Sequence, residues 1–331
     1  MTHQYRKQSE ISVGEIEKAA RKLLNGSLVA FPTETVDGLG ANATDEFSVS
    51  RIYQVKGRPP DHPLIIHIAD IKFLEQWISD IPEFALALAL EFWPGPMTLI
   101  LKRSDLAKNF VTGGQNTVGI RIPNNAIALD LLNFFHNIGG AGVAAPSANR
   151  FRHVSPTDAS AVREELGKFL AETDLILDGG QTAVGLESTI IDCTGTVPRI
   201  LRPGATTGDM INEIIGPRFS ILLGQDSTES NQSRIRVSGS LENHYAPNAK
   251  VILDMEPTAG NGFIALKNIE TPPGAIRLSS PESLDDFARD LYAALREGDR
   301  LKLEAIYVYQ PKGSGLGEAI RDRLSRSSRG R

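Results

Sequence analysis

A strand–turn–helix–strand unit over residues 28–68 constrains the fold of this chain more than any other stretch. An apolar run ends at Phe31 and leads into the turn Pro-Thr-Glu-Thr, a short helical pattern then ends at Lys56, and an apolar strand follows over 64–68. Such a unit brings hydroxyl groups, bare glycine backbone and basic side chains to one end of a sheet, where open α/β sheets bind ligands. We therefore expect an α/β fold with a ligand site at this sheet end.

Lys56 and Arg58 are the basic pair of this unit, and Gly57 between them lets the backbone approach a ligand closely. The first acidic residue after them is Asp61. Two such cations suit an anionic substrate such as a phosphate. The alternative is an ordinary loop between a helix and a strand with solvated charges, and this stretch alone does not separate the two.

The composition is that of an ordinary globular protein. The 331 residues are 41% hydrophobic and 23% charged, the length favours two domains, and the net charge of −5 speaks against a general nucleic-acid-binding surface. The single cysteine, Cys193, excludes an internal disulfide and a cysteine-based zinc site, and its apolar surroundings predict a buried, unreactive thiol. Residues 1–12 are polar and no apolar stretch is long enough to span a bilayer, so we expect a cytoplasmic protein without a membrane partner.

Hydrophobic periodicity places strands and helices along the whole chain. The predicted helices cover residues 12–24, 83–92, 123–135, 155–170 and 282–297, with one more after Asp70 and a last one after Gly317. The predicted strands cover residues 28–31, 64–68, 97–102, 117–122, 142–145, 175–177, 188–192, 199–201, 250–254, 262–266 and 304–309, and residues 112–116 are expected to form a flexible loop. This order predicts a twisted mixed α/β sheet with surrounding helices, followed by a small Rossmann-like α/β unit.

A polar segment divides the chain. Residues 224–240 contain few apolar side chains, as expected of a linker. We expect one domain over residues 10–216, a linker that includes the segment His-Tyr-Ala-Pro over residues 217–249, and a second domain over residues 250–331.

Polar motifs stand at two further strand ends. Ser147-Ala148-Asn149 follows a buried strand directly, and Glu187-Ser188-Thr189 opens another one. Side chains and backbone N–H groups at such ends point to where ligands collect. For the first motif, the alternative is an ordinary Asn/Ser turn.

Charged side chains within or next to apolar strands leave a second choice open. Arg121 and His67 each lie between two isoleucines, and Arg202 precedes a Pro-Gly pair. Each arginine either points into a pocket or lies on a solvated face. The histidine is either a pocket residue or a satisfied group of the core.

The C-terminal segment offers two weaker signals. Gly313-Ser314-Gly315-Leu316-Gly317 follows a strand, but its third glycine comes too early for a dinucleotide fingerprint, so a tight turn before a helix is the better interpretation. The closing IRDRLSRSSRGR is basic, and it either contacts RNA phosphates or forms a solvated, frayed tail. No histidine pair has metal-ligand spacing.

Taken together, motifs along the chain resemble the Sua5/YrdC/YciO family. In order they are PTETVDGLG, KGRP, PLIIHIAD, WPGPMTLIL, TVGIRIP, APSAN, SPT, ESTIID and ILRPGA. The HYAP segment and a second unit ending in GEAIRDRL are similar to the two-domain Sua5-type threonylcarbamoyl-AMP synthases. The resemblance is dense over residues 10–215 and looser over residues 237–331.

The resemblance implies a YrdC-like domain with a concave, positively lined pocket and L-threonylcarbamoyladenylate synthase activity, which is a nucleotidyl transfer. L-threonine, bicarbonate and ATP become threonylcarbamoyl-AMP and diphosphate. Downstream transfer proteins then move the threonylcarbamoyl group to adenosine 37 of tRNAs that read ANN codons, so contact with tRNA is expected to be indirect. Mg²⁺ is expected to arrive with ATP, without a dedicated protein site.

The resemblance also assigns site residues. Lys56 and Arg58 are the expected catalytic pair. Because both lie in a predicted Gly/Pro loop, their replacement is expected to leave the fold intact. The residues assigned to L-threonine are Thr33, Thr35, His67, Arg121 and Ser188, with Arg121 pairing the substrate carboxylate. The residues assigned to ATP are Lys56, Arg58, Thr117, Ser147, Asn149, Ser155, Arg202 and Tyr245. Neither a covalent nucleophile nor a metal ligand is implied.

Two positions depart from the family pattern. Asp37 stands where the family has a tyrosine, and we expect it to point to solvent, with magnesium binding or repulsion of a substrate as alternatives. The segment before HYAP lacks the usual basic residue. One other function stays open, a tRNA- or double-stranded-RNA-binding protein of the same fold. A carbamoyl-transfer domain like those of hydrogenase maturation is a third interpretation, and the absence of zinc-finger and acylphosphatase-like segments argues against it.

Overall fold

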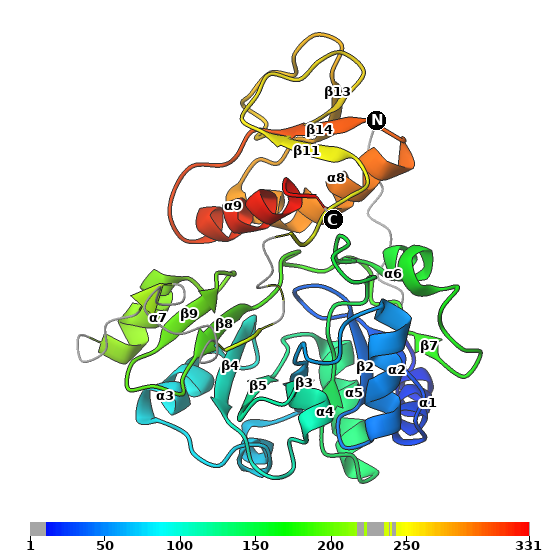
Figure 1. The fold of residues 1–331 in the computed structure, drawn as a ribbon, viewed down its shortest axis with the longest axis vertical. Coiled ribbons are helices and arrows are strands. Elements are labelled where there is room, and N and C mark those ends of the chain that lie inside the picture. The colour runs from blue at the N-terminus through cyan, green and yellow to red at the C-terminus, as the bar shows by residue number, and fades with distance from the viewer. Residues whose placement is uncertain (1–10, 217–221, 224–234, 238, 240–242, 331) are drawn as a thin grey trace.

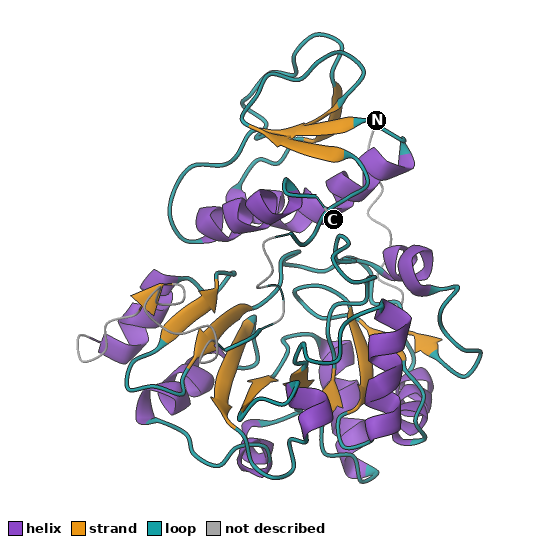
Figure 2. Ribbon diagram, viewed as in Figure 1, coloured by secondary structure: helices purple, strands orange, loops and turns teal. Residues whose placement is uncertain are grey.

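The computed structural model describes residues 11–216, 222–223, 235–237, 239 and 243–330. The molecule has two units, each made of one sheet and its helices. The larger unit lies in the lower half of Figures 1 and 2, and the smaller unit lies at the top. The predicted α/β fold is thus confirmed. Most of the predicted linker lies outside the described residues.

The larger sheet is mixed, as predicted. Within the described residues its strand order is β10-β9-β8-β4-β5-β3-β6-β2-β1-β7. The strands are β1 (Val29–Phe31), β2 (Gly38–Asn42), β3 (Ile65–His67), β4 (Met97–Lys102), β5 (Thr117–Arg121), β6 (Val143–Ala144), β7 (Leu175–Ile176), β8 (Thr189–Asp192), β9 (Arg199–Arg202) and β10 (Leu222–Leu223). The pairs β3–β5 and β4–β8 are parallel, whereas β4–β5 and β8–β9 are antiparallel.

Helices cover both faces of this sheet. They are α1 (Val13–Leu24), α2 (Glu46–Lys56), α3 (Glu83–Phe92), α4 (Asn109–Thr112), α5 (Ala126–Asn137), α6 (Ala159–Leu166) and α7 (Gly208–Ile215), with a 3₁₀ helix at Ile71–Gln76. Val29 and Phe31 of β1 pack with α1 and α5, while Ala30 between them packs in the opposite core. This alternation has the period of two that a strand imposes, and it explains why β1 is apolar at all three positions.

Strand β2 was not predicted, because two of its five residues are glycines, which are depleted in strands. The structure explains their presence. A Cβ atom on Gly40 would lie 2.8 Å from Val143 and 2.9 Å from Phe31, so neighbouring side chains occupy the space that any other residue would need. Packing between strands, rather than strand propensity, selects this sequence.

Helix and strand ends differ from the predictions in a few places. Helices α5 and α6 begin three and four residues later than predicted, after the capping residues Asn125 and Asp158. The segment after Asp70 is a 3₁₀ helix, and α4 ends within the predicted 112–116 loop. Cys193 is 1% exposed, as expected, and burial raises the pKa of its thiol well above the usual value. Among the helices that the structure describes, none combines the length and the apolar character that a membrane span requires.

The smaller sheet is parallel, with the order β11-β14-β12-β13 within the described residues. Its strands are β11 (Lys250–Leu253), β12 (Gly262–Ile264), β13 (Ile276–Ser279) and β14 (Ala305–Val308), of which β13 was not predicted. Helices α8 (Leu284–Arg300) and α9 (Leu316–Ser327) lie between this sheet and the larger unit (Figure 1).

The prediction of a frayed, solvated C-terminal tail is wrong. Arg323 in α9 is 0% exposed, and Ser327 donates a hydrogen bond to the carbonyl oxygen of Tyr245 at 2.8 Å. Arg326 is held by Asp322 through an ion pair of 2.9 Å. Arg323 and Arg326 therefore stabilise the packing of α9 instead of extending into solvent.

Gly185 marks a point where the backbones of the two units come close together. It has φ +78°, and a Cβ atom there would lie 2.4 Å from the Cα atom of Arg289 in α8 and 2.6 Å from the carbonyl oxygen of Ala288. Backbone stands directly against backbone at this point, so no side-chain movement could make room.

We predict that Gly185→Ala weakens the contact between the two units. The left-handed conformation alone costs a non-glycine residue about 1 kcal/mol, and the clash with α8 adds to it. Gly260→Ala is the matched control, because Gly260 has φ +81° with open space around its missing side chain. Thermal unfolding should show a larger loss of stability for Gly185→Ala, and equal losses would contradict the close approach.

The expectation that Asp37 points to solvent is wrong. Asp37 lies just before β2 and is only 2% exposed, because its amide donates to the carbonyl oxygen of Pro156 at 3.0 Å and its own carbonyl accepts from Ala148 at 2.8 Å. Burial, reinforced by Asp158 and Asp178, raises the pKa of the Asp37 carboxyl well above its usual value. Its Oδ1 atom has no hydrogen-bond partner among the described residues.

We predict that Asp37→Asn stabilises the protein increasingly as pH rises. A raised pKa means that the folded protein keeps a proton which the unfolded chain releases near pH 4. The contribution of Asp37 to the free energy of unfolding therefore falls as pH rises above that value, until the pKa of the folded state is passed. Asparagine has the same shape and no charge. Denaturant unfolding of both proteins between pH 4 and pH 8 should give a difference that grows with pH, and a constant difference would contradict the buried carboxyl.

Candidate functional site

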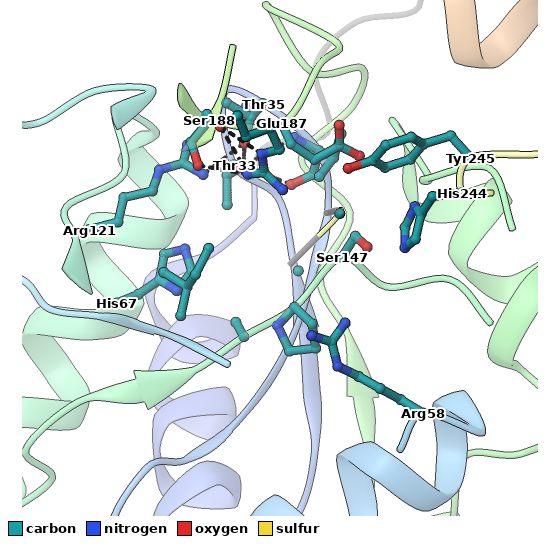
Figure 3. A pocket seen from close by; sticks show the side chains of 17 residues that line it. Thr33, Thr35, Arg58, His67, Arg121, Ser147, Glu187, Ser188, His244 and Tyr245 are labelled. Carbon is teal, nitrogen blue, oxygen red and sulfur yellow. Dashed lines mark hydrogen bonds between the residues drawn. The ribbon is translucent and has the colours of Figure 1, made fainter. Parts of the chain in front are cut away.

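A pocket of about 540 Å³, counted to its open mouth, lies where several strand ends of the larger sheet meet (Figure 3). The pocket is polar and rich in basic groups. Its polar and charged lining residues are Thr33, Thr35, Arg58, His67, Arg121, Ser147, Glu187, Ser188, Arg202, His244 and Tyr245.

The turn after β1 presents two hydroxyl groups to the pocket. Thr33 Oγ1 donates to the carbonyl oxygen of Val36 at 2.7 Å and accepts from the amide of Thr35 at 3.1 Å. The Oγ1 atoms of Thr33 and Thr35 are 2.9 Å apart. A side chain thus closes the Pro-Thr-Glu-Thr turn, and the bonds fix both hydroxyls in place.

Arg121, the last residue of β5, points into the pocket and is 5% exposed, which decides the choice that its sequence left open. Its Nη1 donates to Thr35 Oγ1 at 2.9 Å and its Nε donates to the carbonyl oxygen of Gly95 at 3.2 Å. Its Nη2 lies 2.7 Å from Oε2 of Glu34, an ion pair in which the N–H is not aligned for a hydrogen bond. The guanidinium is therefore held in position before any substrate binds.

His67 lies beside Arg121 in the register of β3 and β5 and also faces the pocket. Burial, and then the charge of Arg121, lowers the pKa of His67 to about 3, so its imidazole is neutral. Nδ1 has no hydrogen-bond partner among the described residues. The ring can therefore offer one hydrogen bond to a ligand without adding charge.

The start of β8 forms the upper wall in Figure 3. Ser188 Oγ lies 2.8 Å from Thr98 Oγ1, and Arg202 Nη2 donates to Ser188 Oγ at 3.1 Å and to its carbonyl oxygen at 2.9 Å. Burial lowers the pKa of Arg202 below its usual value, with Arg323 adding to the effect. Even so, an arginine stays charged at neutral pH, so this wall carries a fixed cation.

Glu187 next to Ser188 joins the pocket to the smaller unit. Its Oε1 accepts from Ser155 Oγ at 2.6 Å, and its Oε2 accepts from the Tyr292 hydroxyl at 2.9 Å and from Arg323 Nε at 2.8 Å. Burial raises the pKa of Glu187, but Arg323, Arg202 and the Ser155 bond outweigh burial and leave the pKa below its usual value. Glu187 is thus an ionised and fully bonded carboxylate.

Four residues surround the opposite part of the pocket. In Figure 3 Arg58, Ser147, His244 and Tyr245 lie across the pocket from Arg121 and His67. Burial, the largest effect, lowers the pKa of Arg58 to about 10, which still leaves it charged. The Tyr245 hydroxyl has no hydrogen-bond partner among the described residues, and the Tyr245 ring stacks on Tyr292 at 5.8 Å.

Lys56, one half of the predicted catalytic pair, does not line the pocket. It is the last residue of α2, is 2% exposed, and donates through Nζ to the carbonyl oxygen of Ser147 at 2.5 Å and to that of Asn149. Burial, and then Arg58, lowers its pKa well below the usual value. The expectation that Lys56 lies in a loop is therefore wrong, whereas its catalytic role stays a prediction.

Three residues assigned to ATP also lie outside the pocket lining. Asn149 donates to the carbonyl oxygens of Arg150 at 2.7 Å and His153 at 2.9 Å, and Ser155 is taken up by Glu187. Thr117 borders a neighbouring groove that Arg236 and Val237 partly line. Their assigned roles in nucleotide binding stay predictions.

Sequence reasoning assigned no role to three residues that shape the pocket. Glu34 stands inside the Pro-Thr-Glu-Thr motif, Glu187 opens a motif that was singled out, and His244 begins the HYAP segment. Each belongs to a motif that the sequence shows, but the neighbouring residues do not indicate which distant side chain each one contacts. The described residues contain no group of three or more His, Cys, Asp or Glu side chains placed to hold a metal ion.

The pocket can bind a ligand with two anionic parts. Arg121, with hydroxyls and a neutral imidazole around it, suits a small carboxylate, since guanidinium and carboxylate match in geometry. Arg58 and Arg202 supply positive charge for a phosphate nearby. No nucleophile activated by a base is needed to explain these residues.

Family models match nearly all of the chain. Residues 21–204 match the Sua5/YciO/YrdC family, described as telomere recombination, and residues 206–328 match the threonylcarbamoyl-AMP synthase C-terminal domain. Threonylcarbamoyl-AMP synthase from Pyrococcus abyssi is 39% identical over 95% of this chain and 94% of its own length. The enzyme of the same name from Bacillus subtilis is 38% identical over 96% and 94%.

A solved structure has the same fold throughout. The crystal structure of P. abyssi Sua5 in complex with L-threonine superposes with a TM-score of 0.84 at 37% identity, and the match covers 97% of this chain and 96% of that one. Both the order of motifs and the arrangement of the two sheets are thus shared over the full length. The chain belongs to the Sua5/YciO/YrdC family, among its two-domain threonylcarbamoyl-AMP synthases.

Proposed function

We propose that this protein makes threonylcarbamoyl-AMP and diphosphate from L-threonine, bicarbonate and ATP. The observation that carries the proposal is the placement of Arg121 with Thr35 and His67 on one side of a single pocket and of Arg58 on the other (Figure 3). One side suits the carboxylate and hydroxyl of threonine, and the other suits the phosphates of ATP. The pocket thereby brings the two reactants of an adenylate-forming reaction together.

Threonine and bicarbonate first form N-carboxylated threonine with loss of water, and an oxygen of the new carboxylate then attacks the α-phosphorus of ATP while diphosphate leaves. Little proton transfer accompanies this step, so positioning and charge neutralisation supply most of the catalysis. Arg121 is already fixed by Thr35, Gly95 and Glu34, so it can orient the substrate carboxylate without rearrangement. Arg58 and Arg202 oppose the negative charge that develops on the phosphates.

Mg²⁺ is expected with ATP, where it neutralises phosphate charge. Magnesium keeps several waters and binds mainly through phosphate oxygens and one or two carboxylates. A cage of protein ligands is therefore not required for this role. Glu187, the carboxylate that lines the pocket, is already saturated by Ser155, Tyr292 and Arg323, so we assign it no metal role.

We further propose that the product passes to separate transfer proteins and then to tRNA, and that this occurs in the cytoplasm. Helix α9 turns Arg323 inward, where it pairs with Glu187, so this cation is not available to RNA. This disfavours direct RNA binding there. We keep the predicted division into residues 10–216, 217–249 and 250–331 as the proposed domain limits.

The test of this function is diphosphate release. The protein is incubated with ATP, bicarbonate and L-threonine, and diphosphate is measured together with threonylcarbamoyl-AMP by mass spectrometry. Release should require L-threonine and should fall when bicarbonate is removed. Release that is independent of threonine, or no release, would refute the proposal.

Arg58 and Lys56 should respond differently to replacement. Arg58→Ala removes a cation from the pocket and should lower kcat/KM by about 10²- to 10³-fold. Lys56→Ala also removes the buried amine that holds the carbonyls of Ser147 and Asn149, which should cost stability, roughly 3 kcal/mol.

Lys56→Met is the matched variant, because it keeps most of the volume and removes only the charged donor. Thermal unfolding and kinetics of the three variants should place the larger stability loss on Lys56. A stable Lys56→Ala protein with strongly reduced activity would instead support a direct catalytic role for the amine.

Tyr245→Phe should raise the KM for ATP and leave the KM for threonine unchanged. The hydroxyl is buried without a described partner and borders the part of the pocket assigned to ATP, while the ring contributes packing against Tyr292 that phenylalanine preserves. The melting temperature should therefore stay close to that of the parent. Equal changes in both KM values would show that Tyr245 does not distinguish the two substrates.

A further inference from the structure

Arg152 is held in an unfavourable backbone conformation beside the pocket. It has φ +70°, which is uncommon for residues other than glycine. Such strain persists only where the surrounding structure imposes it, and it is frequent at functional sites. Its carbonyl oxygen accepts a hydrogen bond from Ala246 at 3.0 Å, directly after the HYAP tyrosine, so the strained residue also fixes this segment.

The guanidinium of Arg152 contacts an aromatic ring and not a carboxylate among the described residues. Its Cζ lies 5.5 Å from the centroid of the Phe151 ring, and it makes no ion pair or hydrogen bond with the described residues. Its Nε atom is shielded from solvent and lacks a hydrogen-bond partner within the part of the chain that the structure describes. A shielded donor without an acceptor is costly, and a ligand acceptor would remove this cost.

The same ring joins Arg152 to the pocket. The Cζ atom of Arg58, a pocket residue, lies 5.9 Å from the Phe151 centroid, and the ring of His244, another pocket residue, packs edge-on against Phe151 at 6.2 Å. Arg152 itself does not line the pocket. Arg58 and Arg152 therefore lie around one ring, Arg58 in the pocket lining and Arg152 outside it.

No carboxylate of the described residues pairs with Arg152. Glu165, on the neighbouring helix α6, is paired with His153 at 3.0 Å and with Arg296 at 3.1 Å. Burial lowers the pKa of His62, whose ring also packs on Phe151, and the charges of Arg58, Arg236 and Arg152 add to this effect against that of Asp61. The group around Phe151 is thus a cationic and aromatic surface at the pocket.

We propose that Arg152 binds the diphosphate portion of ATP, that is, the two phosphates beyond the α-phosphate. The proposal rests on the proposed function, in which ATP occupies the part of the pocket around Arg58. The α-phosphate then lies within the pocket, and the outer phosphates lie between Arg58 and Arg152. Arg152 would also hold diphosphate after the reaction, so its affinity contributes to the rate of product release.

Arg152→Gly is the decisive variant. Glycine adopts φ +70° without strain, so the fold should be retained and the melting temperature should stay close to that of the parent. Lys302→Gly is the matched control, because Lys302 is exposed, belongs to the smaller unit and has φ +55°. It repeats the relief of backbone strain without touching the cationic group. Arg152→Lys keeps the charge and removes the planar fork.

Calorimetric binding to the whole protein separates the possibilities. We expect Arg152→Gly to weaken the binding of ATP and of inorganic diphosphate roughly tenfold, as for the loss of one charge-assisted contact, and to leave the binding of AMP unchanged. Arg152→Lys should recover part of the loss, and Lys302→Gly should bind all three ligands as the parent does.

Unchanged binding of ATP and diphosphate by Arg152→Gly would overturn the proposal. Equal weakening of AMP would also overturn it, because Arg152 would then act on the pocket as a whole. These measurements need no turnover. If the parent fails to release diphosphate in a threonine-dependent manner, the synthase proposal fails, while the binding data still decide the role of Arg152.

Discussion

The carboxylate of Glu187 is the interaction on which the pocket and the smaller unit both depend. Ser155, Tyr292 and Arg323 all donate to it, so three segments that are far apart in the sequence meet at one buried charge. Removing one partner of a buried ion pair costs about 3–5 kcal/mol, because the other charge is left without compensation. Since Ser188 follows directly and faces the pocket, the same network fixes the wall on which Arg202 lies.

Buried cations lie in and beside the pocket of the larger unit. Their hydrogen bonds and ion pairs hold them in fixed positions. Lys56 holds two backbone carbonyls, and Arg121 is fixed by a hydroxyl, a carbonyl and Glu34. Taking such charges out of water is expensive unless each finds a partner. The outcome is a set of positive groups that need no reorganisation when an anion binds, which is the condition for electrostatic catalysis.

The sequence predicted what local pattern determines. Apolar runs located most strands, and the order of motifs located the residues that surround the pocket, Arg121 and Ser188 among them. The sequence could not show that Arg58 lines the pocket while Lys56 is buried outside it. Lys56 is buried because its amine bonds to the carbonyls of Ser147 and Asn149, about ninety residues later. The prediction that Asp37 points to solvent was wrong for the same reason, since the backbone of Pro156 helps to cover it. Burial that is created by distant segments leaves no trace in the local pattern.

Helix α9 shows how a basic segment can be structural. Ile320, Arg323, Leu324 and Ser327 are buried, with the spacing of one helix face, so an arginine occupies a position that the pattern reserves for an apolar side chain. Glu187 is the reason. Without α8 and α9 this carboxylate would keep Ser155 alone and would stand beside an anion-binding pocket, where its charge opposes the phosphates. The smaller unit therefore contributes electrostatically to the pocket, since Arg323 neutralises a carboxylate that would otherwise weaken the binding of an anionic ligand.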